Sequence, residues 1–408
     1  MKNLLKKLKL KRRGIAILAG MHFYGNPSAK LKIVGVTGTN GKTTVVTLLY
    51  RLMIALGYKA GLISTVENII NGEVILTEEG KLVPGTTPDP IALHKLLNKM
   101  VEKGCEYVFM EVSSHALDQN RVAGINFAGG IFTNLTHDHL DYHKNFDNYF
   151  GAKKKFFKML NIRAFALSNI DDEYGEKMLE GIRAKKYTYG FKHKADFYEK
   201  LETKLIGDFN MYNVLAVYAA LMLLGIDKEK VKEQIKNVLP PKGRFDYFKS
   251  SSGVTVIVDY AHTPDALQNV LKTVQGLLAS GEDKKNPTSS GRVISVFGCG
   301  GDRDPLKRSK MGKIGTINSD IVIFTSDNPR SEDPDKIIEQ MKTDLSPEDL
   351  KKVKTISNRR EAIKETVRIA QKGDIILCAG KGHEDYQEIK GVKTHFDDME
   401  EFRRNYSL

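Results

Sequence analysis

Short runs of apolar residues recur along the chain, separated by stretches with helical spacing. The runs are KIVGV, YVFMEV, GGIFTNL, VTVIVDY, RVISVFG, DIVIFTS and DIILCAG. Runs that are apolar at nearly every position are typical of strands buried on both faces of a parallel sheet. The stretches TTVVTLLYRLMIALG and MYNVLAVYAALMLLG have a helical pattern and end at Gly57 and Gly225, the residue type that favours helix ends. The pattern predicts an α/β fold with mainly parallel sheets.

The alternation breaks at LPPKGRFD, from Leu239 to Asp246, where two prolines and a glycine precede a new strand. With 408 residues, the chain is long enough for more than one hydrophobic core. We therefore predict a central domain over residues 31–242 and a smaller, Rossmann-like α/β domain over 243–408, preceded by a tail over 1–30. The polar segment from Ser280 to Gly291 is expected to be an exposed loop of the last domain.

Composition indicates a soluble, intracellular protein. Apolar residues make up 41% and charged residues 28%, and no apolar run reaches the roughly 18 residues of a membrane span. The three cysteines, Cys105, Cys299 and Cys378, are far apart and lack metal-binding spacing. These features predict a cytoplasmic protein without disulfides.

The positive charge is concentrated at the start of the chain. The formal net charge is +13, and seven lysines and arginines lie among the first 13 residues, which contain no acid. The tail LLKKLKLKRR is either a basic amphipathic helix in weak contact with an anionic membrane surface or an acidic partner, or a solvated terminus. Because the chain has no tryptophan and no interleaving of aromatic and basic residues, a nucleic-acid surface is not expected.

The segment VTGTNGKTT, Val36 to Thr44, lies between a predicted strand and a predicted helix, the context of a P-loop that binds phosphate. Backbone N–H groups of the loop and helix N-terminus would surround phosphate oxygens, Lys42 would reach the terminal phosphates, and the Thr43 hydroxyl would contact Mg²⁺. Val36 replaces the first glycine of the strict GxxxxGK[ST] pattern, so the loop is a variant. The predicted nucleotide contacts are Gly38, Thr39, Asn40, Gly41, Lys42, Thr43 and Thr44.

Two further polar segments follow predicted strands: FMEVSSHALDQNR and FTNLTHDHLDYH. Ligands collect at the carboxyl ends of strands in open parallel sheets. Glu111 and His139 are therefore candidates for a Mg²⁺ site beside the phosphates, together with Thr43. Taken alone, the histidines of HDHLDYH are equally compatible with a transition-metal site or with a polar loop.

Four motifs of the last domain also follow predicted strands: DYAHTPDA, FGCGGDRD, SDNPRSEDP and AGKGHEDYQ. They would meet at one edge of the sheet and form a second binding face. Arg303 and Arg330 offer guanidinium groups for a carboxylate, and Asp327 and Glu384 offer carboxylates for an ammonium group. Each motif alone is compatible with a solvated turn, but together they predict a site for a zwitterionic amino acid.

These motifs in combination resemble those of the Mur ligases, the muramyl peptide ligases, and within that family the branch that adds meso-diaminopimelate. The likeness runs from FYGNPSAKLKIVGVTGTNGKTT to AGKGHEDYQ, nearly the whole chain after residue 22. The family's phosphate loop is a GTNGKT variant, and DYAHTPDAL, GCGGDRD, DNPR and GKGHE are specific in combination. The resemblance implies a cytoplasmic, ATP- and Mg²⁺-dependent ligase of peptidoglycan synthesis. It would join meso-diaminopimelate to the D-glutamate carboxylate of UDP-N-acetylmuramoyl-L-Ala-D-Glu, the UDP-MurNAc dipeptide, through an acyl phosphate.

The resemblance also implies roles for individual residues. Lys42, Lys153 and His139 would be catalytic, and Lys153 in YFGAKKKFF would be carbamylated, although a plain surface lysine is the alternative beside Lys154 and Lys155. Mg²⁺ would be bound by Thr43, Glu111, His139 and Lys153, and the nucleotide would also contact Asn210 and Arg244. The muramyl dipeptide would be held by Thr86, Thr87, Ser113, Gln119 and Arg121. The amino acid would be held by Arg303, Asp327, Asn328, Arg330, Gly380 and Glu384.

One feature departs from the family pattern. Family members carry a UDP-binding domain before the phosphate loop, whereas only about thirty mostly basic residues stand there in this sequence. The alternatives are a ligase acting on a UDP-free or lipid-linked peptide, and a non-catalytic nucleotide-binding subunit of a cell-wall complex. A likeness to folylpolyglutamate synthase is disfavoured by DNPR and GKGHE, and the presence of Lys42, Glu111, His139 and Lys153 together argues against lost activity.

Overall fold

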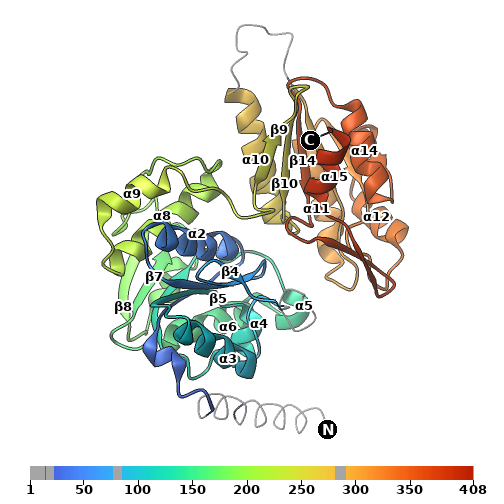
Figure 1. Cartoon of the computed structure of the whole chain (residues 1–408). Coiled ribbons are helices and arrows are strands. Elements are labelled where there is room, and N and C mark those ends of the chain that lie inside the picture. Colours follow the sequence, from blue (N-terminus) through green and yellow to red (C-terminus); the bar gives the residue numbers. More distant parts are fainter. Residues whose placement is uncertain (1–13, 15–22, 77–84, 281–290, 408) are drawn as a thin grey trace, which may run out of the picture. The chain divides into compact units, whose positions relative to one another are not determined.

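The computed structural model describes residues 14, 23–76, 85–280 and 291–407. The chain divides into two compact units (Figure 1). The first comprises Met1–Thr136 and His143–Leu239, and the second comprises His137–Tyr142 and Pro240–Leu408. The basic tail, residues 1–13, and most of the polar segment near residue 285 lie outside the described residues, so the predictions made for them are not addressed.

The first unit is built on an eight-stranded sheet in the order β4-β3-β2-β5-β1-β6-β7-β8. The six neighbouring strands β2, β5, β1, β6, β7 and β8 pair in parallel. The short strands β3 and β4 extend the sheet beyond β2 with antiparallel pairing. The strand bounds are β1 Lys32–Thr37, β2 Ala60–Ile63, β3 Asn68–Ile70, β4 Glu73–Val74, β5 Tyr107–Glu111, β6 Phe127–Phe132, β7 Phe165–Asn169 and β8 Lys185–Tyr189.

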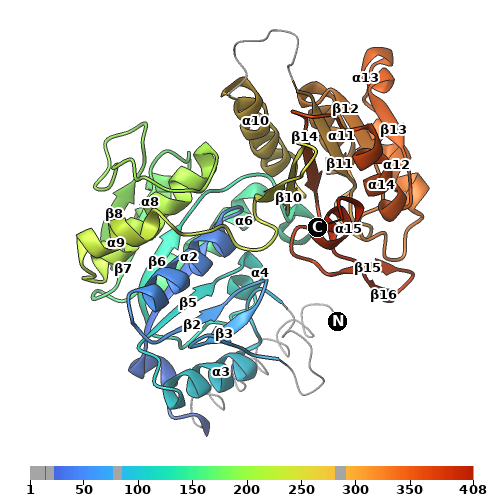
Figure 2. The same ribbon diagram turned by 45° about the horizontal axis from the view of Figure 1, so that its top comes forward.

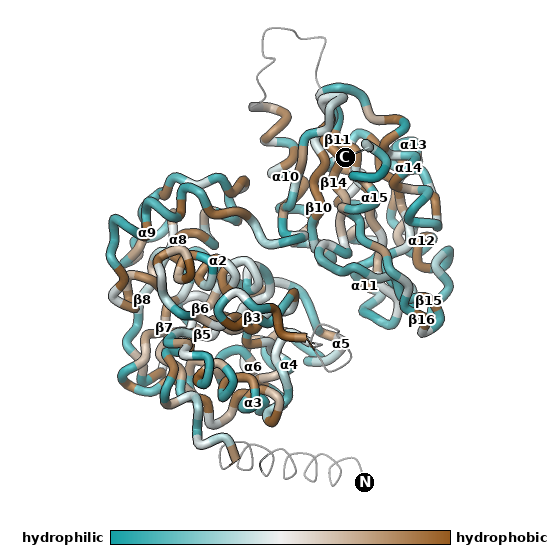
Figure 3. The backbone as a smooth tube through the Cα atoms, in the orientation of Figure 1, coloured by the Kyte–Doolittle hydropathy of each residue, from teal (hydrophilic) through white to brown (hydrophobic). Residues whose placement is uncertain are grey.

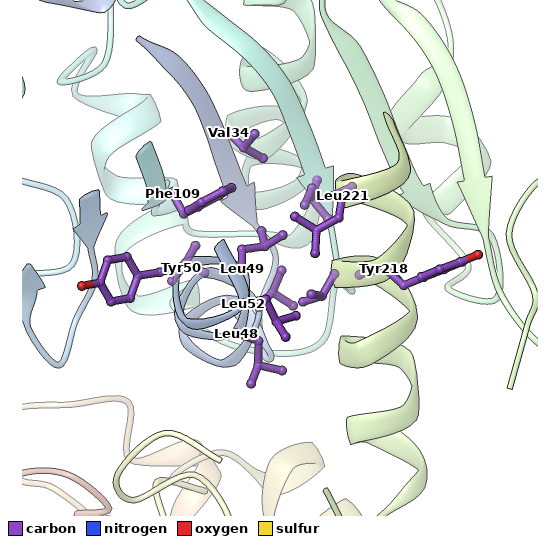
Figure 4. Close-up of a cluster of buried hydrophobic side chains, with 14 of the residues drawn as sticks. Val34, Leu48, Leu49, Tyr50, Leu52, Phe109, Tyr218 and Leu221 are labelled. Atoms are coloured by element: carbon purple, nitrogen blue, oxygen red, sulfur yellow. The ribbon is translucent and has the colours of Figure 1, made fainter. Parts of the chain in front are cut away.

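Helices cover both faces of this sheet (Figure 2). On one face, α2 and α8 pack Leu49 and Leu221 against Val34 and Phe109 of the strands (Figure 4). On the other face, Gly35 of β1 leaves room for the ring of Phe156 on α6, since a Cβ there would lie 2.6 Å from that ring. The helices are η1 Pro27–Lys30, α2 Lys42–Ala55, α3 Pro90–Glu102, α4 Ser114–Asp118, α5 Leu140–His143, α6 Phe146–Met159, α7 Gly175–Leu179, α8 Asp208–Leu223 and α9 Lys228–Ile235.

The second unit has a six-stranded sheet in the order β13-β12-β11-β14-β10-β9 and a separate hairpin, β15-β16. All neighbouring pairs in the sheet are parallel except β10 with β9. The strands are β9 Asp246–Lys249, β10 Thr255–Asp259, β11 Val293–Phe297, β12 Ile321–Phe324, β13 Val353–Thr355, β14 Ile375–Ala379, β15 Tyr386–Ile389 and β16 Val392–His395.

Helices also cover both faces of the second sheet. The face formed by Val256, Ile294 and Ile376 packs against α14 and α15, through side chains such as Ile363 and Phe402. On the opposite face, Gly315 of α11 lies against Phe297 of β11. The helices of this unit are α10 Pro264–Ser280, α11 Leu306–Asn318, α12 Pro334–Lys342, α13 Pro347–Lys351, α14 Arg359–Ile369 and α15 Asp398–Asn405.

The predicted α/β fold with mainly parallel sheets is confirmed. Each of the apolar runs forms a strand, namely β1, β5, β6, β10, β11, β12 and β14, and hydrophobic stretches follow the central strands of both units (Figure 3). The helix ends are also as predicted, because Gly57 and Gly225 adopt φ of +87° and +79° just after α2 and α8. Within the described residues, no helix combines the length and the apolar composition needed to cross a membrane.

Candidate functional site

The loop between β1 and α2 is held by neutral polar groups that follow the neighbouring strand β6. The N–H of Thr39 donates to the carbonyl of Asn134, and the N–H of Asn40 donates to Oδ1 of the same asparagine, both at 2.8 Å. The hydroxyl of Thr133 donates to the carbonyl of Asn40 at 2.6 Å. Thr133 and Asn134 were not among the predicted site residues, although they belong to the segment FTNLTHDHLDYH that drew attention to this strand end.

Glycine is required twice in this loop. Gly38 has φ +154° and Gly41 has φ +86°. A Cβ on Gly38 would lie 1.9 Å from Thr133 Oγ1, and one on Gly41 would lie 2.5 Å from Asn213 Oδ1. The same Asn213 donates through Nδ2 to Oδ1 of the predicted nucleotide contact Asn210, at 3.2 Å. The loop is therefore closely packed between the end of β6 and the start of α8.

Two lysine ammonium groups meet at this loop. Lys42 Nζ donates to the carbonyls of Gly38 and Thr39, at 3.0 and 2.7 Å. Lys153, on α6 and only 1% exposed, donates through Nζ to the same Gly38 carbonyl at 2.7 Å. Its neighbour Lys155 has a half-exposed side chain near Asp118. Lys153 is therefore buried against the predicted phosphate loop and is not a plain surface lysine, and two positive charges lie at the carbonyl of Gly38.

The carboxylate of Glu111, at the end of β5, is paired with the first helical turn of α2. Its Oε1 accepts from Thr43 Oγ1 at 2.9 Å and from the Thr65 N–H at 2.7 Å. Glu111 is 1% exposed, and its Oε2 has no hydrogen-bond partner among the described residues. A buried carboxylate oxygen without a partner is costly unless a cation or a donor approaches it.

His139 lies in the short segment His137–Tyr142, which belongs to the second unit. Its Nε2 is 3.4 Å from Oδ2 of the preceding Asp138. Burial alone would raise the pKa of Asp138, but the nearby positive groups of His139, His262 and Lys307 lower this pKa to about 2. Among the described residues, no three His, Cys, Asp or Glu side chains gather in the manner of a transition-metal site.

The five predicted muramyl dipeptide residues lie together at the end of β5. Thr87 Oγ1 donates to the carbonyl of Glu111 at 2.9 Å and accepts from the Ser113 N–H at 3.1 Å. Arg121 donates to the Thr87 carbonyl at 2.8 Å, and it donates twice to the side-chain oxygen of Gln119, at 3.0 and 2.8 Å. The hydroxyl of Thr86 accepts from that of Thr65 at 3.1 Å, which connects the group to the Glu111 carboxylate.

In the second unit, the ends of β12 and β14 bring several predicted amino-acid contacts together. Asn328 Nδ2 donates to Glu384 Oε2 at 2.7 Å, and the Asn328 N–H donates to Asp327 Oδ1 at 2.6 Å. Gly380 has φ +112°, and a Cβ there would lie 2.5 Å from Asp327 Oδ2. Burial raises the pKa of Glu384 and the charge of Asp327 adds to that, whereas Lys381, Asn328 and Arg330 act in the opposite direction without cancelling it.

Arg330 sits beside this cluster in a left-handed backbone conformation, with φ +51°. Its NH1 donates to the Gly301 carbonyl at 2.7 Å, and its N–H donates to the Glu388 carbonyl on the hairpin at 3.0 Å. Arg303 is exposed in the same loop as Gly301. Arg330 therefore connects its own motif to FGCGGDRD and to the hairpin strand β15, which extends just beyond AGKGHEDYQ, and Arg303 lies in the FGCGGDRD loop.

The remaining predicted residue, Arg244, also belongs to the second unit. Its guanidinium carbon lies 4.2 Å from the ring centroid of Tyr260, which also contacts the rings of His262 and His383 at 4.6 and 4.9 Å. The neighbouring Asp259 is buried, and burial raises its pKa to about 6. These tilted rings and the guanidinium at the end of β10 offer both a charge and ring faces to a ligand.

Comparison with known families gives a clear result for both units. The Mur ligase middle domain matches residues 36–221, and the Mur ligase, glutamate ligase domain matches residues 243–382. The chain belongs to the Mur ligase family. Membership makes it one of a family of ligases and accounts for the phosphate loop at the start of the first matched region.

Several relatives of this Mur ligase carry the same name. The UDP-N-acetylmuramoyl-L-alanyl-D-glutamate--2,6-diaminopimelate ligase of Bacteroides fragilis is 50% identical over 96% of this chain and 81% of its own length. The ligase of the same name from Cytophaga hutchinsonii is 52% identical over 92% of this chain and 78% of its own. The chain thus spans about four fifths of these relatives.

Solved structures agree with this assignment. A structure titled as UDP-N-acetylmuramoyl-L-alanyl-D-glutamate--2,6-diaminopimelate ligase matches this Mur ligase with a TM-score of 0.60 and 33% identity, over 92% of this chain and 78% of that one. Folylpolyglutamate synthase of Mycobacterium tuberculosis, solved with ADP, has a TM-score of 0.69 at 16% identity, over 93% and 96% of the two chains. The second likeness shows the shared fold alone.

Proposed function

We propose that this Mur ligase uses ATP to join meso-diaminopimelate to the D-glutamate carboxylate of UDP-N-acetylmuramoyl-L-Ala-D-Glu, a step of peptidoglycan synthesis in the cytoplasm. The relatives named for this reaction support the choice of substrates. The observation that carries the proposal is the meeting of Lys42 and Lys153 at the Gly38 carbonyl, beside the Glu111 carboxylate that has an unpaired buried oxygen.

The residues around Glu111 fit Mg²⁺. Oxygen donors are the ligands that Mg²⁺ prefers, and Thr43 and Glu111 supply them with one carboxylate oxygen still unpaired. We assign the metal to Thr43 and Glu111, with His139 and a carbamylated Lys153 as further ligands. Bound there, the ion would neutralise charge on the transferring phosphoryl group.

The chain's own residues then divide the chemistry between the two units. In the first, the loop from Gly38 to Thr44 and the helix N-terminus of α2 hold the phosphates of ATP, while Lys42 stabilises charge on the γ-phosphoryl group. Asn210, and Arg244 of the second unit, hold the rest of the nucleotide. The glutamate carboxylate of the acceptor attacks the γ-phosphorus, forming an acyl phosphate and releasing ADP.

The second unit supplies the amine. Arg330 and Arg303 bind a carboxylate of diaminopimelate. The ammonium group is surrounded by the remaining predicted residues, namely Asp327, Asn328, Gly380 and Glu384. The ammonium group first loses a proton to solvent, and the resulting neutral amine attacks the acyl carbonyl. The C–O bond to phosphate then breaks, inorganic phosphate leaves, and the nitrogen gives up a second proton to solvent as the amide forms. Thr86, Thr87, Ser113, Gln119 and Arg121 hold the acceptor during both steps.

The domain assignment follows from this division. We propose residues 31–242 as the ATP-binding domain, residues 243–408 as the amino-acid-binding domain, and the basic tail over residues 1–30 as a weak contact to a membrane surface or an acidic partner. Binding of nucleic acid forms no part of the proposal.

Phosphate release by the purified protein tests the function. Reactions contain ATP, Mg²⁺ and the UDP-linked dipeptide, with meso-diaminopimelate, lysine or no amino acid. The proposal predicts release that requires the dipeptide and is fastest with meso-diaminopimelate, together with the tripeptide product in the mass spectrum. Equal release with lysine would refute the assigned amino acid, and release with a UDP-free or lipid-linked peptide only would refute the assigned acceptor.

A further inference from the structure

A buried arginine lies directly beneath the amino-acid site, and none of the roles considered above includes it. Arg359 is the first residue of α14, and its side chain and that of Asp398 on α15 are 0% exposed. The two are joined by a bidentate ion pair, with Nε to Oδ1 and NH2 to Oδ2 both at 2.7 Å.

The rest of the Arg359 guanidinium is bonded to the ends of two strands. NH1 donates to the carbonyl of Ser326 at 3.2 Å, and NH2 donates to the carbonyl of Ala379 at 3.1 Å. NH2 also lies 3.3 Å from Cys378 Sγ. Ser326 immediately precedes Asp327, and Ala379 immediately precedes Gly380. A single planar group thus holds the backbone on both sides of the point where Asp327 meets Gly380.

Stability alone gives little reason for a charged group at this place. A positive charge on the first residue of a helix is disfavoured by the helix dipole. A buried ion pair can often be replaced by apolar side chains without loss of stability. What apolar side chains cannot supply is the pair of N–H donors that fixes the two strand ends at a set separation.

The following residue provides a matched comparison. Arg360 also pairs bidentately with a carboxylate of α15, Glu401, with both contacts at 3.0 Å. Its side chain is 50% exposed, and its guanidinium donates to neither strand end. Arg360 therefore resembles Arg359 in its charge and in linking α14 to α15, but it makes no contact with the ends of β12 and β14.

We infer that Arg359 is a positioning residue for amino-acid selection, which sets the spacing between Asp327 and Gly380 by holding the carbonyls of Ser326 and Ala379. The inference rests on the proposed function and deepens it. Arg359 does not touch the ligand; it acts through the two strand ends. Its loss therefore weakens the binding of the amino acid more than it weakens the binding of ATP.

Steady-state phosphate release tests this with wild-type protein and three variants: Arg359→Lys, the double variant Arg359→Met/Asp398→Leu, and the control Arg360→Met. The double variant removes both members of the buried pair, so that no unpaired charge is left in the core. Thermal unfolding of each variant is measured alongside. The KM values for meso-diaminopimelate and for ATP are determined separately.

We expect the double variant to fold, with a lower unfolding temperature because the carbonyls of Ser326 and Ala379 lose their donors. Its KM for meso-diaminopimelate should rise by about tenfold, because the two strand ends are no longer held at a set separation. Its KM for ATP stays within about twofold. Arg359→Lys, which keeps the charge but not the planar fork, recovers only part of the affinity. Arg360→Met has the wild-type KM for both substrates.

Two results would overturn the inference. One is a folded double variant whose KM for meso-diaminopimelate matches wild type; the other is a change of equal size in both KM values or in kcat alone. Failure of the proposed function is seen separately, because wild-type protein would then show no phosphate release that depends on meso-diaminopimelate.

Discussion

The phosphate loop and the amino-acid site are held in place by different kinds of groups. In the first unit, neutral groups of Thr133 and Asn134 hydrogen-bond to the backbone of the loop, and Asn213 packs against it. Lys42 and Lys153 also donate to its carbonyls, but they do so from the positions proposed for binding phosphate. In the second unit, buried charges do the holding, since Arg359 fixes two strand ends.

The second unit repeats this use of charge. Arg308, 1% exposed, donates twice to the carboxylate of Glu332 at 2.8 Å and also to the carbonyl of Gly300 at 3.3 Å. Glu332 in turn accepts from the Asp302 N–H at 2.6 Å. A buried arginine thus ties the loop of Arg303 to the loop of Arg330.

The difference follows from the ligands proposed for the two sites. Because triphosphate is strongly anionic, the lysines near the loop can bind the ligand, while neutral groups hold the loop backbone in place. A zwitterionic amino acid needs both signs of charge in one small site, and unsupported like charges there would repel one another. Ion pairs beneath the site hold its positive and negative side chains in fixed positions.

Loss of Lys42 should give the largest effect. Lys42→Ala is expected to lower kcat by about a thousandfold, because it removes the positive charge assigned to the transferring phosphoryl group. The KM for meso-diaminopimelate should not change. Phosphate release with the meso-diaminopimelate concentration varied and the other substrates saturating measures both quantities, and a kcat within tenfold of wild type would remove Lys42 from the chemistry.

Lys153→Ala should follow, with kcat lowered by about a hundredfold. The matched control is Lys155→Ala on the same helix, whose exposed side chain pairs only weakly with Asp118 at 3.7 Å and whose loss should leave kcat unchanged. Carbamylation adds a second readout, because wild-type activity should rise when bicarbonate is restored to carbon dioxide-free buffer. A kcat for Lys153→Ala that, like that of Lys155→Ala, matches wild type would place Lys153 outside the site.

Arg330→Ala should affect the amino-acid site of the second unit and leave the phosphate loop unaffected. The KM for meso-diaminopimelate is expected to rise by tenfold or more, since a charged contact with a carboxylate contributes roughly 1.5 to 3 kcal/mol. The KM for ATP should be unaffected. Kinetics with each substrate varied in turn will show this separation, and an unchanged KM for the amino acid would exclude Arg330 from its site.

The second unit should also be sensitive to acid. The raised pKa of Glu384 means that its carboxylate gains a proton at a higher pH than an ordinary glutamate does. Since the charged form is assigned to the ammonium group, the KM for meso-diaminopimelate should rise as pH falls, by about tenfold per unit once pH is below that pKa. Glu384→Gln should have a high KM with a flat pH profile; a profile as steep as that of wild type would point to another group.

The smallest effect is expected from the neutral scaffold of the first unit. Asn134→Ala removes the side-chain acceptor and the side-chain donor that pair with the backbone of Asn40, and should lower the free energy of unfolding by about 2 kcal/mol. Because the backbone contact of residue 134 with Thr39 is kept, the KM for ATP should rise only about fivefold. Chemical denaturation and ATP kinetics measure the two changes, and a loss as large as that of Lys42→Ala would contradict the division between scaffold and charge.

The sequence revealed the parts of both sites that depend on local pattern. Buried parallel strands read as continuous apolar runs, and their ends carried the motifs that hold Glu111, Asp327 and Gly380. The other strands were not predicted: β2, β3, β4, β7, β8, β9, β13 and the hairpin β15-β16. β2 and β7 are buried, but AGLI has only four residues and FALSN ends in polar residues, while most of the others are short or partly exposed. Their pairing depends on the neighbouring strands more than on their own residues.

The scaffold residues were missed for a related reason. Asn213 and Arg359 stand within ordinary helices, and nothing in the spacing of their neighbours distinguishes them from other polar residues of a helix. Their roles arise from tertiary contacts with Gly41 and with the ends of β12 and β14. Conversely, His139 could be found from its motif, but the sequence did not indicate that its segment groups with the second unit.

Trapping of the acyl phosphate with hydroxylamine tests the division of labour most directly. Wild-type, Lys42→Ala and Arg330→Ala proteins are incubated with ATP, Mg²⁺, the UDP-linked dipeptide and hydroxylamine, without diaminopimelate, and the hydroxamate is quantified. If activation of the acceptor does not depend on the amino-acid site, Arg330→Ala will form hydroxamate at the wild-type rate and Lys42→Ala will form almost none. A matching loss of hydroxamate in Arg330→Ala would contradict the account, because Arg330 would then take part in activating the acceptor.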